Sequence, residues 1–126
     1  MASPSDCLYS ATHEWHRVQG DTCTLGITRY AVDALTDVTY VNTKPVGAKV
    51  AAGGTVGEVE SVKTTGDVYS GVAGEVAEVN KALVDNPALL NADPYANWLV
   101  KIKISDRSGL ERLMSAEAYD KANPAH

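Results

Sequence analysis

Hydrophobic and polar residues alternate with period two along much of the chain, the pattern of half-buried strands. The clearest case is 99–104, where apolar residues alternate with Lys101 and Lys103. A hairpin turn at 19–21 joins the first two strand-like segments. The predicted strands cover 15–18, 23–27, 38–41, 55–60, 68–70, 75–79 and 98–104. The pattern therefore predicts a mainly β fold.

Helices are predicted to be few and short. They are expected at 29–35, after Asn86-Pro87 as far as Leu90, after an Asp106 or Ser108 cap as far as Met114, and at 116–122. Thr28 and Ser115 are good N-caps for the first and last of these, because a hydroxyl there accepts an N–H from the first turn. Pro87 suits a first helical position.

The length of 126 residues and a hydrophobic content of 44% predict one domain, 1–126, with a real core. Residues 1–7 are expected to form a loose lead-in and residues 123–126 a frayed tail. Of the two cysteines, Cys23 is expected to be a small core residue, whereas Cys7 lies near the terminus, a position that leaves its exposure open. A disulfide between them ranks low, and their spacing is not that of a zinc or redox motif.

The net charge of −5 argues against nucleic acid, whose phosphates require a basic surface, and against an anionic membrane. Solubility alone is an equally good explanation of the acidic balance. The first basic residue is Arg17, so no basic leader precedes an apolar segment. No run reaches the roughly 18 apolar residues of a membrane span.

The sequence offers weak candidates for metal binding or catalysis. His13 and His16 belong to a predicted strand, where residues three apart point to opposite faces, and His126 lies in the tail. No metal site is therefore expected. Ser61 and Ser70 lack the setting of an activated nucleophile, so no catalytic residue is expected either.

Lys63 is the remaining chemical candidate. It follows Glu60-Ser61-Val62 and precedes the small residues 64–66, between two segments rich in glycine and valine. If these segments are strands related by a pseudo-twofold, Lys63 lies at a hairpin tip with its amine displayed. The plain alternative is an ordinary surface lysine between ordinary turn glycines.

Several ordered blocks resemble one family, the H proteins of the glycine cleavage system, from about Tyr9 to Lys121. The blocks are His13-Glu14-Trp15, Gly26-Ile27-Thr28, Gly57-x-Val59-Glu60-Ser61-Val62-Lys63, Asp67-x-Tyr69-Ser70, Gly74-Glu75-Val76, Asp93-Pro94-Tyr95, Trp98-Leu99-Val100 and Ala116-Glu117-Ala118-Tyr119. Each block is weak alone, and their order makes the set specific.

The resemblance implies a barrel-sandwich hybrid of the lipoyl/biotinyl type with an N-terminal strand extension and a C-terminal helix. Lys63 would carry lipoate in amide linkage, within the attachment motif Glu60, Ser61 and Val62. The chain would be a carrier rather than an enzyme. It would shuttle the aminomethyl group of glycine from a pyridoxal-phosphate glycine decarboxylase to a tetrahydrofolate-dependent aminomethyltransferase. Dihydrolipoamide dehydrogenase and a lipoate-attaching enzyme would be its other partners.

A groove for the loaded arm is a further hypothesis. The aminomethyl group is expected to be cationic near neutral pH, so a carboxylate would hold it. Glu14 is the candidate, with Thr12 and Asp67 as polar neighbours and Ile27 as a wall. The alternative is a solvated Glu14 in an unremarkable strand. Family members commonly have proline where this chain has Gly71, which predicts a looser strand after the hairpin.

Other carriers fit less well. Biotin carriers usually have methionines around the lysine, and the lipoyl domains of 2-oxoacid dehydrogenases usually have aspartate before it, whereas Val62 stands here. An H-like protein that donates lipoate to other enzymes, or an unmodified interaction module, stays open. The expected setting is a monomer in a bacterial cytoplasm, or in the mitochondrial matrix if the source is eukaryotic.

Overall fold

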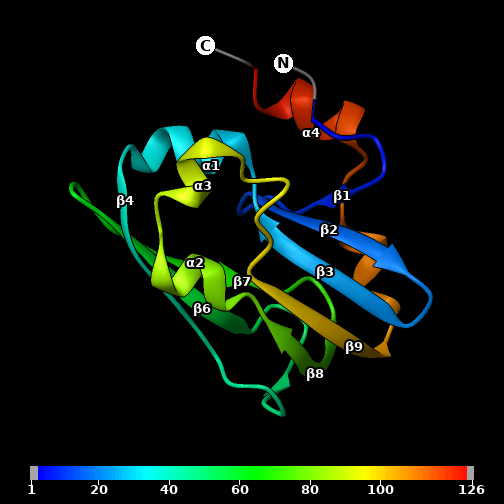
Figure 1. The fold of residues 1–126 in the computed structure, drawn as a ribbon. Coiled ribbons are helices and arrows are strands. Elements are labelled where there is room, and N and C mark those ends of the chain that lie inside the picture. The colour runs from blue at the N-terminus through cyan, green and yellow to red at the C-terminus, as the bar shows by residue number, and fades with distance from the viewer. Residues whose placement is uncertain (1–2, 125–126) are drawn as a thin grey trace.

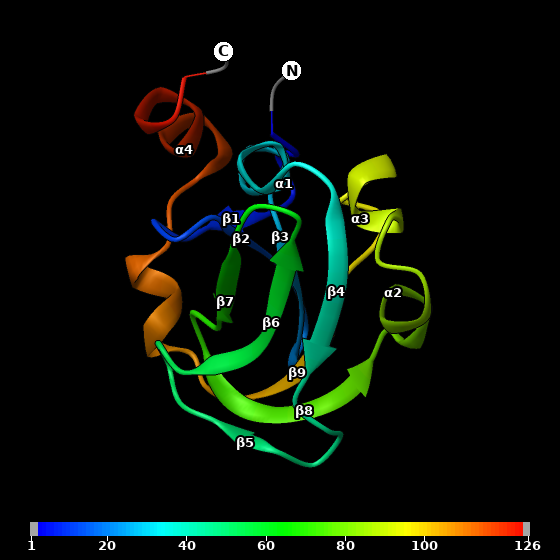
Figure 2. The same cartoon turned by 90° about the vertical axis from the view of Figure 1, so that its left-hand side faces the viewer.

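The computed structural model describes residues 3–124 and contains two antiparallel sheets with short helices around them (Figure 1). The larger sheet has the order β1-β2-β3-β9-β8-β5, formed by β1 Leu8–Tyr9, β2 Glu14–Gln19, β3 Thr22–Ile27, β9 Val100–Asp106, β8 Ala73–Val79 and β5 Lys49–Val50. The smaller sheet has the order β4-β6-β7, formed by β4 Val38–Thr43, β6 Thr55–Ser61 and β7 Thr65–Tyr69. In Figure 2 this smaller sheet lies in front of β2 and β3.

All seven predicted strands are present, so the prediction of a mainly β fold is confirmed. In β9, Val100 and Ile102 are buried while Lys103 is exposed, as the alternation requires. The predicted turn closes the β2–β3 hairpin, where Gly20 adopts a φ of 60°. β1 and β5 were not predicted, because two residues are too few to show a periodicity. Ser70 lies outside β7, contrary to the prediction.

The two capped helices begin and end at the predicted residues. They are α1 Arg29–Leu35 and α4 Ala116–Ala122. Thr28 Oγ1 accepts the N–H of Ala31 at 3.2 Å, and Ser115 Oγ accepts the N–H of Ala118 at 3.2 Å. These two caps are local interactions, which is why the sequence reveals them.

The other helical segments differ from the predictions. They are α2 Lys81–Asp85, which was missed, α3 Leu89–Ala92, and the 3₁₀ helix η1 Ser108–Arg112. Pro87 is not the first helical residue, because the N-cap of α3 is Ala88. The η1 segment ends before Met114, since Leu113 is already extended. Segments this short depend on tertiary packing more than on their own propensity.

The main core lies between the two sheets. Valine, leucine and isoleucine side chains from both sheets and from α1, α2 and α3 form one buried cluster. Cys23 belongs to this cluster and is fully buried, as predicted. Removing such apolar surface from water contributes about 1.5–3 kcal/mol per large side chain, so this cluster fixes how the sheets face each other.

A second cluster joins the two ends of the described chain. It contains Cys7, Tyr9, Trp15 and Tyr119 from α4. The rings of Tyr9 and Tyr119 stack with centroids 4.8 Å apart. Cys7 is only 3% exposed, so its place near the terminus does not leave it open to solvent. Both thiols are free, and burial raises the pKa of Cys7 to about 11.

The described part of the lead-in, residues 3–7, is held by polar contacts. The Oγ of Ser3 donates to the Asp120 carboxylate at 2.6 Å, and Asp6 pairs with Arg17 at 2.9 Å. The lead-in is therefore tied down more firmly than expected. Residues 1, 2, 125 and 126 lie outside the described chain, and with them His126 and the end of the expected tail. Within 3–124 no helix is long and apolar enough to cross a membrane.

Candidate functional site

The hairpin of β6 and β7 projects beyond the rest of the molecule, at the left of Figure 1. Val59 pairs with Gly66 and Glu60 with Thr65, which leaves residues 61–64 as the tip. Val62 is 71% exposed and Lys63 is also exposed. The structure therefore places Lys63 where the sequence predicted it, at the end of a projecting hairpin.

Ser61 organises this tip through its side chain. Its Oγ accepts the N–H of Lys63 at 3.2 Å and that of Thr64 at 3.1 Å, and its own N–H donates to the carbonyl of Thr64 at 2.8 Å. The N–H of Val62 donates to the carbonyl of Asp37 at 3.3 Å, which ties the tip to the chain before β4. Serine favours such turns because its hydroxyl replaces a backbone acceptor. The backbone of the tip is thus fixed, while the lysine side chain projects from it.

Glu14 opens β2 at the far end of a tight turn. The N–H of Ser10 donates to the carbonyl of Glu14 at 3.0 Å, and that of His13 to the carbonyl of Ser10 at 3.1 Å. His13 has a φ of 74° and precedes β2, so its prediction as a strand residue was wrong. Its Nδ1 lies 2.7 Å from the hydroxyl of Tyr119, which holds the turn against α4. This turn directs the Glu14 side chain inward.

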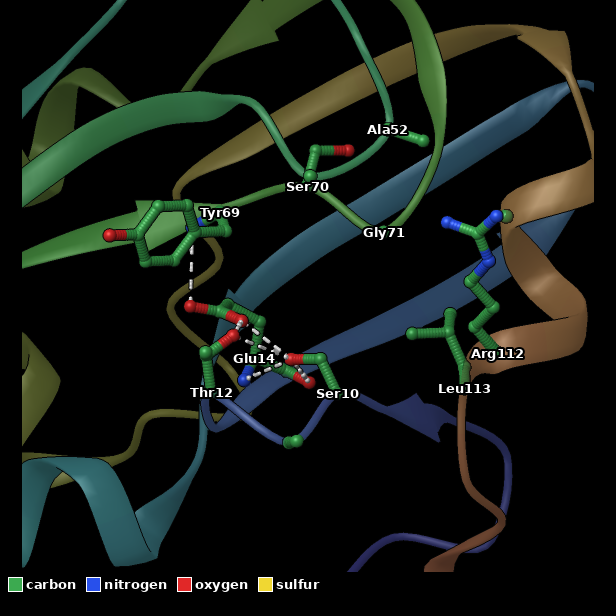
Figure 3. Close-up of a pocket in the computed structure, with 12 residues that line it drawn as sticks. Ser10, Thr12, Glu14, Ala52, Tyr69, Ser70, Gly71, Arg112 and Leu113 are labelled. Atoms are coloured by element: carbon green, nitrogen blue, oxygen red, sulfur yellow. Dashed lines mark hydrogen bonds between the residues drawn. The ribbon is translucent and has the colours of Figure 1, made fainter.

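The Glu14 carboxylate is buried, at 1% exposure, and hydrogen-bonded on both oxygens (Figure 3). Ser10 Oγ donates to Oε1 at 2.5 Å, and Thr12 Oγ1 also donates to Oε1. The backbone N–H of Tyr69, the last residue of β7, donates to Oε2 at 3.1 Å. Burial raises the pKa of Glu14, and these hydrogen bonds oppose the rise. The solvated Glu14 of the alternative hypothesis is not what the structure contains.

Glu14 lies in the wall of a cavity of about 220 Å³. The turn of Ser10 forms one side, and Arg112 and Leu113 form the opposite side in Figure 3. Tyr69 and the loop after it complete the wall. Of the residues in this wall, only Glu14 and Thr12 were sequence candidates for the groove. The wall residues come from distant segments of the chain, and no local pattern joins them.

The structure brings together only part of the predicted groove. Thr12 contacts Glu14 directly. Ile27 is the register partner of Glu14 on β3, but it is 4% exposed and packs in the main core. Asp67 is exposed on β7, two residues before Tyr69, and does not line the cavity. Because β7 rises about 3.4 Å per residue, the Lys63 tip and the cavity are separated by about 20 Å of chain.

His16 lies buried behind the cavity and supports its wall. Its Nε2 accepts the N–H of Gly71 at 2.9 Å, while its Nδ1 has no partner among the described residues. A Cβ on Gly71 would lie 2.8 Å from Leu113, and one on Gly109 would lie 2.0 Å from the Gly71 carbonyl oxygen. The expectation that Gly71 loosens this segment was therefore wrong. Its N–H makes a hydrogen bond that proline lacks, and its size lets η1 pack closely.

Neutral His16 is expected to make folding stability depend on pH. Burial lowers its pKa from 6.5 to about 4, so the unfolded chain binds more protons between these values. The contribution of neutral His16 to the free energy of unfolding is complete above pH 6.5. It is lost as the pH falls toward 4, a change of about 3 kcal/mol. Urea denaturation at several pH values should show this loss, and His16→Gln should reduce it. The raised pKa of Glu14 changes stability with pH in the opposite direction, and it does so in both the wild type and His16→Gln. If the free energy of unfolding depends equally on pH in the two proteins, the prediction is contradicted.

The comparisons with known proteins agree on one family. Residues 7–125 match the family model described as "Glycine cleavage H-protein". The chain is 48% identical over 113 residues to the glycine cleavage system H protein of Thermoanaerobacter sp. (strain X514), covering 90% of each chain. It is 49% identical over 120 residues to that of Thermus thermophilus, covering 94% of each. The crystal structure of such a protein from Mycobacterium marinum superimposes with a TM-score of 0.90 at 38% identity, covering 98% of this chain and 100% of that one.

Proposed function

The chain belongs to the glycine cleavage H-protein family, and on this premise we propose that Lys63 is the residue that carries its lipoyl group. The protein is the lipoyl carrier of the glycine cleavage system, and members of this family bear lipoate in general. Its relatives are carriers rather than catalysts. We extend this to the chain itself, which then serves as a substrate of partner enzymes and has no catalytic residue of its own.

The observation that carries the assignment is the exposure of Lys63 on an ordered tip. An amide linkage at Nζ requires an amine that an attaching enzyme reaches, and no ion pair of Lys63 is found within residues 3–124. A Cβ on Gly66 would meet no atom within 4 Å, so the space beside the tip is open. When bound, the lipoyl dithiolane supplies the redox and group-transfer chemistry. The residues of the chain display it, and Ser61 fixes the backbone at its root.

Glu14 is proposed to receive the aminomethyl cargo when the arm folds back. A cationic amine is attracted more strongly by a carboxylate that is shielded from bulk water, and Glu14 is buried in the cavity wall. Thr12 supports the role by its hydrogen bond to Oε1. Asp67 adds negative charge on the route along β7, and Ile27 pairs with Glu14 from the neighbouring strand β3.

The carrier role implies contact with the other components of the glycine cleavage system. We propose the specific partners to be the pyridoxal-phosphate glycine decarboxylase, the tetrahydrofolate-dependent aminomethyltransferase, dihydrolipoamide dehydrogenase and a lipoate-attaching enzyme. The relatives reported above come from bacteria, which favours a bacterial cytoplasm over a mitochondrial matrix as the setting. A monomer suits successive docking to several enzymes.

Peptide mapping tests the assignment. The protein is expressed in a lipoylation-competent host supplied with lipoate, and its intact mass is measured before proteolysis. We expect the mass gain of one lipoyl group, located on the peptide that contains Lys63. The exposed lysines Lys44 and Lys103 serve as internal controls and should stay unmodified. A gain located on any other lysine, or no gain at all, would refute the assignment.

A further inference from the structure

The hydroxyl of Ser10 contacts Glu14 at two points. It accepts the backbone N–H of Glu14 at 3.0 Å and donates to Oε1 of the same residue at 2.5 Å. The backbone of Ser10 is fixed as well, by its N–H bond to the Glu14 carbonyl. One half-buried serine thus ties the amide, the carbonyl and the carboxylate of Glu14 together. A hydroxyl that accepts from one donor becomes a stronger donor itself, so the two contacts reinforce each other.

The two carboxylate oxygens of Glu14 differ in how many further hydrogen bonds each can accept. Each carboxylate oxygen accepts about two hydrogen bonds. Oε1 already accepts two, from Ser10 and Thr12, whereas Oε2 accepts one, from the N–H of Tyr69. A cationic ligand therefore finds its acceptor at Oε2, on the β7 side. This distinction holds only while the carboxylate keeps its present orientation.

Ser10 is better placed than Thr12 to maintain that orientation. The Thr12 residue is exposed and makes one contact with the carboxylate, so water readily replaces it. Ser10 is half-buried and lies within the turn that positions Glu14. Loss of the Ser10 hydroxyl leaves the N–H of Glu14 without the Ser10 oxygen as its acceptor. It also removes a hydrogen bond from Oε1, so the carboxylate is free to rotate.

We propose that Ser10 is a positioning residue, which fixes the Glu14 carboxylate so that Oε2 accepts the cationic cargo of the arm. This inference rests on the proposed role of Glu14. It adds the residue that directs the cationic cargo to one of the two carboxylate oxygens. The other charged side chain of the cavity wall, among the described residues, is Arg112 on the opposite side. Tyr69 is the other titratable residue of that wall.

The first measurement uses the protein without its lipoyl group. The Glu14 side-chain carboxyl carbon is followed by NMR through a pH titration in the wild type and in Ser10→Ala. Removal of a donor to the charged form should raise the pKa by about 1 unit. Ser10→Thr keeps the hydroxyl and should restore the wild-type titration. Ser5→Ala removes an exposed serine from the same end of the chain and should change nothing.

The second measurement uses the loaded carrier. The aminomethyl carbon should be lost about 2- to 10-fold faster from Ser10→Ala, the range expected for one hydrogen bond, and at the wild-type rate from Ser10→Thr. Ser10→Cys, whose thiol is a weaker donor of similar size, should fall between them and replaces Ser10→Ala if that variant does not fold.

Three outcomes would decide against parts of this scheme. An unchanged titration of Glu14 in Ser10→Ala and Ser10→Cys overturns the positioning role. A raised pKa with no faster loss of carbon, in a series where Glu14→Gln does lose it faster, also overturns that role. Unchanged loss in Glu14→Gln itself overturns the proposed function of Glu14, and the titration then still decides whether Ser10 holds its carboxylate.

Discussion

Replacement of Lys63 by arginine is expected to abolish both lipoylation and carrier activity. Arginine keeps the positive charge and the length of the side chain, but its guanidinium stays protonated and does not offer a nucleophilic amine. The tip should keep its conformation, because Ser61 binds the backbone of residue 63 rather than its side chain. Intact mass should show no lipoyl gain. Glycine-dependent NADH formation with purified partner enzymes should fall to the background without carrier.

The matched control for this variant is Lys44→Arg, which changes an exposed lysine just beyond β4 in the same way. It should be lipoylated and active like the wild type. Residual lipoylation of Lys63→Arg would mean that another lysine accepts the group. Full lipoylation on Lys63 with no transfer activity would instead favour the alternative of a lipoate donor that serves other enzymes.

Glu14→Gln is expected to shorten the lifetime of the loaded arm by about 10- to 150-fold. The amide keeps the size of the side chain but removes the charge that faces the cationic cargo, and a hydrogen bond to a charged group contributes about 1.5–3 kcal/mol. The measurement is the rate at which the carbon is released from the isolated loaded carrier at neutral pH. Initial lipoylation should be unaffected, because Glu14 lies at the opposite end of β7 from the tip.

Glu117→Gln provides the control, since this exposed carboxylate on α4 does not line the cavity. It should release the carbon at the wild-type rate. An unchanged rate in Glu14→Gln would show that the cargo is held elsewhere or not at all. A faster rate that high salt abolishes equally in both proteins would point to general charge screening rather than to a specific pair.

The features that local chemistry determines were predictable from the sequence. Thr28 and Ser115 cap their helices at the predicted residues because a cap involves only the first turn. The Lys63 hairpin was predictable because two strand-like segments rich in glycine and valine flank a short tip. His13 was misassigned to a strand, because contacts with residues distant in the sequence, Thr28, Tyr30 and Tyr119, help to hold its left-handed backbone.

The carboxylate cavity depends on long-range geometry and was only partly predictable. The family resemblance suggested Glu14 and Thr12, but not the N–H of Tyr69. That donor belongs to the last residue of β7, which pairs with Thr55 of β6, and it reaches Glu14 from a segment 55 residues away in the sequence. Backbone donors carry no side-chain signature, so no residue pattern indicates them. The η1 wall was missed for a similar reason, since a close contact between Gly71 and Gly109 decides its position.

Among residues 3–124 the strand β7 pairs with β6 on one side only, so its other side is a free sheet edge. Free edges are templates on which a second chain adds a strand and starts aggregation. Glu14 occupies the N–H of Tyr69 at one end of this edge, and Asp67 places an exposed charge in its middle. We therefore expect the acidic side chains assigned to the cargo also to hinder the addition of a strand from a second chain at this edge.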